Sequence, residues 1–153
     1  MGNFIRIERI PYEEPYHVQL VWEVSNGDIS SRFEYYDNAE SLKEIGKGLE
    51  HFPRHGGDVF LHEIGSEKPE DRFAYYFRFR AFSTDSRGGS AVQIRFCNNS
   101  ELPYRKSFEF CIQAEPAALN RLGKLFLEFA KLEQEYMAWS DFESFIGGKH
   151  EFA

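Results

Sequence analysis

Apolar and polar residues alternate along most of this chain, and this alternation constrains the fold more than any other feature. The clearest run has Tyr16, Val18, Leu20, Trp22 and Val24 at every second position. Side chains at alternate positions of a β-strand point to the same face of a sheet. The pattern therefore predicts about seven strands, each with one apolar and one polar face, over residues 4–10, 16–25, 28–36, 58–64, 72–83, 92–97 and 105–114.

Glycine, asparagine and proline mark the breaks between these strands. Asn26-Gly27 supplies the positive φ angles of a two-residue hairpin turn between the second and third strands. Pro11 and Pro15 lack backbone donors, so we expect a break between the first and second strands. The Gly-rich segment 85–89 predicts a further turn.

Two segments instead repeat apolar residues every three or four positions, which is typical of amphipathic helices. The first begins after Asn38, a capping residue, and should end near Phe52, because Pro53 disfavours helical geometry in the residue before it. The second begins at 115–116 and should run to about Tyr136. The apolar stripes are Leu42, Ile45 and Leu49 in the first helix and Leu119, Leu122, Phe126 and Phe129 in the second.

Strands that arrive in runs, with only two helices, favour an α+β fold over a parallel βαβ sheet. We predict one antiparallel sheet of about seven strands, with both helices packed on its apolar face and its polar face open to water. A chain of 153 residues is the size of one domain, and no linker divides it. We assign residues 1–146 to a single domain and expect residues 147–153 to fray.

The charge and the cysteines indicate a compartment and exclude some partners. The formal net charge of −7 repels polyphosphates at long range, so we expect no nucleic-acid partner. Charges interrupt every apolar run, so we expect neither a signal peptide nor a membrane partner. Cys97 and Cys111 are too few for a disulfide scaffold and should be free thiols. These features predict a cytoplasmic protein.

No spacing typical of an enzyme or of a metal site occurs. The G-x-S-x-G motif is absent, the five histidines are scattered, and 46–48 (Gly-Lys-Gly) falls inside a predicted helix without the rest of a phosphate loop. The sequence therefore indicates no catalytic residue, no metal and no cofactor, and it favours a non-catalytic protein.

Basic residues concentrate in one part of the chain. Residues 72–106 contain seven basic and two acidic side chains, a net charge of +5, so the remainder carries −12. By strand parity, Arg78 and Arg80 share the open face with Tyr76, and Arg95 shares it with Gln93 on a neighbouring strand. Guanidinium groups suit carboxylates and phosphates, and a neighbouring tyrosine can stack or donate a hydrogen bond.

Three interpretations of this cluster remain open. The arginines could pair across strands with Glu109, Glu63, Glu23 or Glu34 and only keep the face hydrated. They could recognise another protein, as in an immunity-like or regulatory protein. They could also bind a small anionic ligand or substrate, with His62 or Glu109 as a base, which requires a pocket. The candidate residues for these binding interpretations are Tyr76, Arg78, Arg80, Gln93, Arg95 and Glu109.

Four apolar residues point to the polar side by strict alternation, namely Val21, Tyr36, Phe60 and Phe82. They could form a patch for a partner or a second subunit, which leaves a homodimer open. A β-bulge would instead turn them inward.

Three segments, taken in order, resemble a family of small bacterial proteins with no assigned activity. They are 65–69 (Gly-Ser-Glu-Lys-Pro), 103–105 (Pro-Tyr-Arg) and 118–123 (Ala-Leu-Asn-Arg-Leu-Gly), and the likeness extends over residues 18–129. The resemblance implies a bacterial, cytoplasmic α+β protein and transfers no site residue. In size and acidity the chain is also similar to immunity proteins that neutralise a toxin domain, which is an analogy.

Overall fold

The computed structural model describes residues 2–14 and 16–152, and it contains two antiparallel β-sheets rather than one. The prediction of a single sheet of about seven strands is therefore wrong, whereas the α+β class is confirmed. The first sheet has five strands in the order β3-β2-β1-β8-β9, and the second has four in the order β4-β5-β6-β7.

The elements of the two sheets follow one another along the chain, except that the last two strands return to the first sheet. The five-stranded sheet consists of β1 (Asn3–Glu13), β2 (His17–Asn26), β3 (Ser30–Asp37), β8 (Tyr136–Ser140) and β9 (Ser144–Gly147). The four-stranded sheet consists of β4 (Val59–Gly65), β5 (Tyr76–Ser83), β6 (Ser90–Cys97) and β7 (Ser107–Ala114). The helices are α1 (Ala39–Glu50) and α2 (Pro116–Phe129), and short 3-10 helices span Pro69–Asp71 and Lys149–Glu151.

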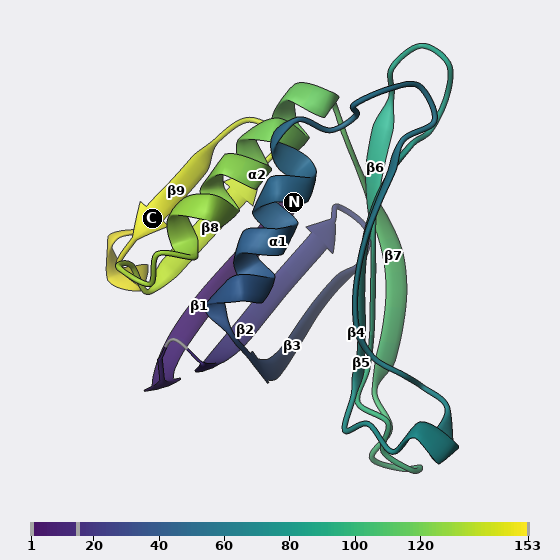
Figure 1. Ribbon diagram of the computed structural model, residues 1–153, viewed down its shortest axis with the longest axis vertical. Coiled ribbons are helices and arrows are strands. Elements are labelled where there is room, and N and C mark those ends of the chain that lie inside the picture. Colours follow the sequence, from purple (N-terminus) through teal and green to yellow (C-terminus); the bar gives the residue numbers. More distant parts are fainter. Residues whose placement is uncertain (1, 15, 153) are drawn as a thin grey trace.

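The two sheets share one hydrophobic core with the helices. In Figure 1, α1 and α2 lie side by side over the five-stranded sheet, and the four-stranded sheet stands beside them, seen edge-on. The Trp22 ring of β2 lies 5.2 Å from Phe77 of β5 and 5.9 Å from Phe126 of α2. Both sheets turn their apolar faces to this core, so the alternation within each strand is the same as in a single sheet.

The second helix is shorter than its sequence suggests, and the chain after it forms β8 and β9. Leu132 adopts a left-handed conformation with φ 60°, a few residues after α2 ends. β8 then pairs with β1, and its residues 136–139 are all buried. The Trp139 indole N–H donates to the Ala118 carbonyl of α2 at 2.9 Å. A strand buried on both faces shows no alternation, which explains why the sequence pattern did not reveal it.

The predicted hairpin between β2 and β3 is present, with Gly27 and Asp28 as its turn residues. The Asn26 N–H donates to the Ile29 carbonyl at 3.1 Å, and the Asn26 side chain accepts from the backbone N–H of both Asp28 and Ile29. Gly27 has φ 96°, a conformation that favours glycine in such turns. β1 extends further than predicted, because Pro11 still pairs with Val18.

The two helices pack closely because glycines lie at their contact. A Cβ atom on Gly123 would lie 2.5 Å from the backbone nitrogen of Glu50. The Asn120 amide, one turn away in α2, donates to the carbonyls of Leu49 and Phe52 at 2.9 and 2.8 Å. The segment 118–123 therefore fixes the C-terminal end of α1 against α2.

The tail for which we expect fraying contains the 3-10 helix Lys149–Glu151 and a packed aromatic residue. The Phe152 ring lies 5.6 Å from the ring of Tyr136 and 5.5 Å from that of Phe145. These contacts place the tail on the outer side of β8 and β9.

Candidate functional site

All six candidate residues lie on the outer face of the four-stranded sheet, the face turned away from the core. β5 contributes Tyr76, Arg78 and Arg80, β6 contributes Gln93 and Arg95, and β7 contributes Glu109. The register places Arg78 opposite Arg95, Arg95 opposite Glu109, and Arg80 opposite Gln93. We call this surface, from β4 to β7, the arginine face.

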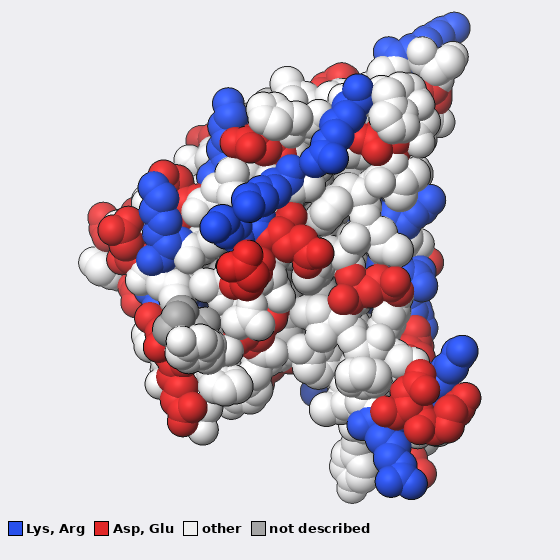
Figure 2. Space-filling view, viewed as in Figure 1, with Lys and Arg blue, Asp and Glu red and all other residues white. Residues whose placement is uncertain are grey.

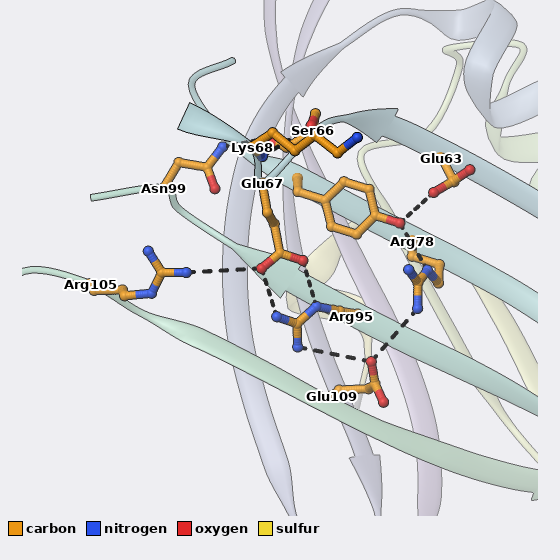
Figure 3. Close-up of polar contacts among 10 residues, drawn as sticks. Glu63, Ser66, Glu67, Lys68, Arg78, Arg95, Asn99, Arg105 and Glu109 are labelled. Carbon is orange, nitrogen blue, oxygen red and sulfur yellow. Dashed lines mark hydrogen bonds and ion pairs between the residues drawn. The ribbon is translucent and has the colours of Figure 1, made fainter. Parts of the chain in front are cut away.

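A row of charged side chains crosses the arginine face from strand to strand. Glu63 of β4 pairs with Arg78, and Arg78 is followed by Arg95 and Glu109. Figure 3 shows Glu109 reaching both arginines, with N–O distances of 3.8 Å to Arg78 and 3.9 Å to Arg95. Two like charges on neighbouring strands repel each other, and the flanking carboxylates offset this repulsion.

A tyrosine hydroxyl fixes the first of these arginines. The Tyr76 hydroxyl donates to the Glu63 carboxylate and accepts from Nε of Arg78 at 2.8 Å. Burial raises the pKa of Tyr76 above its ordinary value, and the hydrogen bond to Glu63 raises it further. The phenol therefore stays neutral and holds the guanidinium of Arg78 in one orientation.

A carboxylate from a loop, Glu67, fixes the second arginine. Glu67 follows β4 and accepts two hydrogen bonds from the Arg95 guanidinium, both at 2.7 Å, and Arg105 lies 3.9 Å from the same carboxylate. The hydrogen bonds from Arg95 hold the pKa of Glu67 below its ordinary value. Sequence reasoning missed Glu67 as a site residue, because strand parity gives no direction for a loop side chain.

Backbone geometry folds this loop over the sheet. Gly65 has φ 79°, and a Cβ atom there would lie 2.1 Å from the Tyr75 carbonyl oxygen. The Asn99 amide donates to the carbonyls of Ser66 and Phe73 at 2.8 and 3.0 Å. The signal that could have drawn attention to Glu67 is the segment 65–69, which is one of the three that carry the family resemblance.

Arg80 differs from the other two arginines. Its guanidinium lies 4.7 Å from the centre of the Phe82 ring, and no carboxylate of the described residues lies within ion-pair distance of it. Leu61 of β4 pairs with Arg80, and Val59 pairs with Phe82. Leu61 and Val59 are 47% and 49% exposed, so this half of the arginine face is apolar and carries an unmatched positive charge.

The structure separates the three interpretations of the cluster. Arg78 and Arg95 are matched by Glu109, and Glu63 contributes through Tyr76, as the pairing interpretation predicts. Glu23 and Glu34 lie on the five-stranded sheet and do not take part. The pairing interpretation does not account for Arg80.

The candidate base His62 lies on the wrong face for chemistry at the arginines. It is 4% exposed, and its Nδ1 lies 2.5 Å from the Glu44 carboxylate of α1. A cleft of about 830 Å³ adjoins the arginine face, and it is lined by loop residues that include Glu67 and Arg105 but not Arg78, Arg80 or Arg95. The side chains of Arg78 and Arg95 are 32% and 25% exposed, so solvent reaches the sheet surface on which they lie.

The two cysteines share the outer face but do not meet. Cys97 pairs with Ser107, whereas Cys111 pairs with Gln93, so they lie four strand positions, or roughly 13 Å, apart along the sheet. Both are free; Cys97 is buried and Cys111 is exposed. Partial burial raises the pKa of the Cys111 thiol, with a further contribution from Glu109. Among the described residues, no group of three or more His, Cys, Asp or Glu side chains is placed to hold a metal ion.

Two of the apolar residues expected on the polar side face inward or are covered. Phe60 packs against α1, where a Cβ atom on Gly48 would lie 2.2 Å from its ring. Val21 is buried at 6% exposure, whereas Tyr36 is 57% exposed. The predicted common patch therefore does not form, and Phe82 belongs to the arginine face.

Comparison with known proteins gives distant structural matches. The structure of the plant transcriptional regulator PBF-2 matches 85% of this chain and 76% of its own, with 10% identity and a TM-score of 0.46. The crystal structure of WHY3 from Arabidopsis thaliana matches 85% of this chain and 82% of its own, with 11% identity and a TM-score of 0.45. No family model and no curated protein matches the chain. Similarity at this level assigns neither a family nor a function, and the resemblance to a bacterial family stays a prediction.

The exclusion of nucleic acid as a partner is wrong. It depended on net charge alone. Net charge does not describe local charge: Figure 2 shows basic and acidic side chains mixed on the face that carries α1 and α2. Within the described residues, no helix is long and apolar enough to span a membrane.

Proposed function

We propose that this protein is a non-catalytic interaction protein whose arginine face binds an acidic, partly apolar segment of another protein. The observation that carries the proposal is Arg80, a guanidinium without a carboxylate partner among the described residues, beside the exposed side chains of Leu61 and Val59. A carboxylate of the partner would form an ion pair with Arg80, and an aliphatic side chain of the partner would pack over Leu61 and Val59.

The composition of the surface supports a protein partner. Residues that dominate binding energy in protein interfaces are enriched in arginine and tyrosine, and apolar neighbours exclude water around them. The arginine face offers Arg78, Arg80 and Arg95, with Phe82 as an aromatic support. Glu67 and Glu109 match the other two arginines, so the positive charge left to attract an acidic partner is that of Arg80.

The fixed geometry of Arg78 and Arg95 also supports binding. Arginine side chains lose rotamer entropy when they are ordered in an interface. Here Tyr76 and Glu67 already hold the two guanidinium groups, so a partner meets them in a preformed orientation. Arg80 then supplies the unmatched charge.

A small anionic ligand is the second candidate, and the shape of the site disfavours it. Ligand sites are concave and enclose most of the ligand surface. The arginines lie on an open sheet face, and His62, the proposed base, lies on the other side of the sheet.

Selection from a library of short random peptides tests the proposal. We expect the enriched sequences to combine Asp or Glu with an aliphatic or aromatic residue. Their affinity for Arg80→Ala should fall about tenfold, the loss of one charge-assisted contact. Arg54→Ala is the matched control, because Arg54 is exposed on the loop after α1.

Three results would contradict the proposal. They are enrichment of basic peptides, equal binding by Arg80→Ala and the unaltered chain, and the absence of any enriched sequence. Thermal stabilisation by inorganic phosphate or citrate would instead support the small-ligand candidate, and binding of a single-stranded oligonucleotide that is lost in Arg80→Ala would assign the face to nucleic acid.

We also propose a cytoplasmic location, which two free cysteines support, because reducing compartments keep thiols unpaired. Cell fractionation with an antibody to the protein tests this location, and recovery from a membrane or extracellular fraction would contradict it.

A further inference from the structure

A groove separates the edges of the two sheets, away from the arginine face. It has a volume of about 440 Å³, and its walls are residues 31–34 of β3 on one side and Lys106 with residues 107–108 of β7 on the other. Its floor is aromatic, since the Phe33 ring lies 4.8 Å from Phe96 and 5.3 Å from Phe108. In Figure 1, β3 is the strand of the five-stranded sheet that lies next to the four-stranded sheet.

One wall of the groove is an open backbone edge of β7. Near the end of this strand, the amides of Asn26 and Asn3 donate to the carbonyls of Cys111 and Gln113, at 3.3 and 2.8 Å. These carbonyls therefore point away from β6. In an antiparallel pair the direction alternates, so the backbone groups of 107 and 109 also point outward, and no described residue pairs with them.

The opposite wall is the open edge of β3. The Tyr75 hydroxyl donates to the Tyr36 carbonyl at 3.0 Å, so this carbonyl points away from β2. By the same alternation, the backbone groups of Arg32 and Glu34 point into the groove. Side chains thus donate hydrogen bonds to the backbone at one end of each strand edge, and the backbone groups along the groove have no partner among the described residues.

The charge at the mouth of the groove is positive. Lys106 is exposed, and no carboxylate of the described residues lies within ion-pair distance of it. Arg32 is partly matched by Glu34, at 3.8 Å. An occupant with a carboxylate would therefore complement the wall that carries Lys106.

We propose that the groove accepts an extended strand of a partner protein, which pairs with β7 and adds a fifth strand to the four-stranded sheet. Unpaired strand edges are templates for such addition, in which backbone hydrogen bonds give affinity and alternate side chains give specificity. The residue opposite Phe108 faces the aromatic floor and is a large apolar residue. The residue two positions along lies on the same face, beside Lys106, and is acidic.

This proposal is independent of the arginine face. The backbone groups of 32, 34, 107 and 109 lack partners among the described residues, so the proposal predicts an occupant that binds through its backbone as well as through its side chains. A test must therefore distinguish pairing through the backbone from contact through side chains.

The test uses a synthetic threonine-rich peptide with one phenylalanine and one glutamate two positions from it, measured by fluorescence anisotropy. Two versions are N-methylated at alternate residues, one on the edge that pairs with β7 and one on the opposite edge. We expect methylation of the pairing edge to weaken binding about tenfold or more, and methylation of the opposite edge, which faces β3, to weaken it less.

Two protein variants complete the test. Ser107→Pro removes the backbone N–H of residue 107, which faces the groove. Proline is tolerated at the start of a strand, so this variant should lose binding while its circular dichroism spectrum is unchanged. Lys106→Glu should weaken binding about tenfold, and a peptide with lysine in place of glutamate should restore it.

Equal binding of the two methylated peptides would overturn the proposal, as would failure of the unmethylated peptide to bind the unaltered chain. A single-stranded oligonucleotide that displaces the peptide from the unaltered chain and also binds the Ser107→Pro variant would assign the groove to nucleic acid instead. The N-methylated peptides give a result on the unaltered chain even if Ser107→Pro does not fold.

Discussion

The contact between α1 and α2 depends on the absence of a side chain at Gly123, and Gly123→Ala tests this directly. Alanine has a higher helix propensity than glycine by about 1 kcal/mol, so an isolated helix would gain stability. In this protein the new Cβ atom would lie 2.5 Å from the Glu50 nitrogen and 2.8 Å from the Leu49 carbonyl carbon. Backbone atoms cannot rotate away, so we expect the helices to separate by roughly 1 Å, since ordinary contacts begin near 3.4 Å.

The magnitude follows from two opposing contributions. Overpacking of this kind costs about 1–3 kcal/mol. Separation of the helices also weakens the hydrogen bonds from Asn120 to Leu49 and Phe52, each of which contributes about 0.5–1.5 kcal/mol. After the gain in helix propensity, we expect the free energy of unfolding to fall by about 1–3 kcal/mol.

Urea unfolding followed by tryptophan fluorescence measures this change, because Trp22 and Trp139 are both buried. Gly56→Ala is the control: nothing lies within 4 Å of the position that its Cβ atom would occupy, and we expect a change within about 0.5 kcal/mol. In a double variant, Asn120→Ala should cost less beside Gly123→Ala than alone, because both act on one contact. A Gly123→Ala protein as stable as the unaltered chain, or more stable, would refute the close packing of the helices.

Two further predictions concern the arginine face. Glu67→Gln should lower the free energy of unfolding by up to about 1 kcal/mol at neutral pH, because the pair with Arg95 is partly exposed. The pKa of Glu67 is lowered in the folded state, so this difference in the free energy of unfolding should be present above pH about 4.3 and disappear as the pH falls further. Urea titrations across that pH range measure the difference. A difference that stays constant with pH would be inconsistent with the ion pair. Arg95→Ala should lower the free energy of unfolding by about 1 kcal/mol and Arg80→Ala by less than about 0.5 kcal/mol, because of these two arginines only Arg95 forms a bidentate pair. A larger loss of stability in Arg80→Ala would show that Arg80 stabilises the fold.

Much of this structure follows from the sequence because strand parity is a local property. The alternation around Trp22 and Phe77 indicated the strands and their inner faces, and it placed Arg78, Arg80 and Arg95 on one outer face. The capping residue Asn38 and the turn at Gly27 were also local signals.

The division into two sheets could not be predicted, because it depends on long-range pairing. The pairing of β1 with β8 joins residues near opposite ends of the chain, and β8 is buried on both sides, so neither periodicity nor turn residues mark it. The position of Glu67 depends in the same way on tertiary contacts, through Gly65 and Asn99. Strand parity also could not show that Arg80 lacks a carboxylate while Arg95 has one.

The claim that the arginine face binds an acidic segment is tested most directly at Cys111, an exposed thiol on that face. The measurement is the rate of Cys111 alkylation with and without a saturating acidic peptide taken from the selection, with buried Cys97 as the internal control for unfolding. The account predicts that the peptide slows alkylation about tenfold, that added salt reverses the protection, and that a chain with alanine at 78, 80 and 95 shows none. A peptide that binds while Cys111 reacts at an unchanged rate would contradict the account, because the acidic segment would then lie elsewhere on the protein.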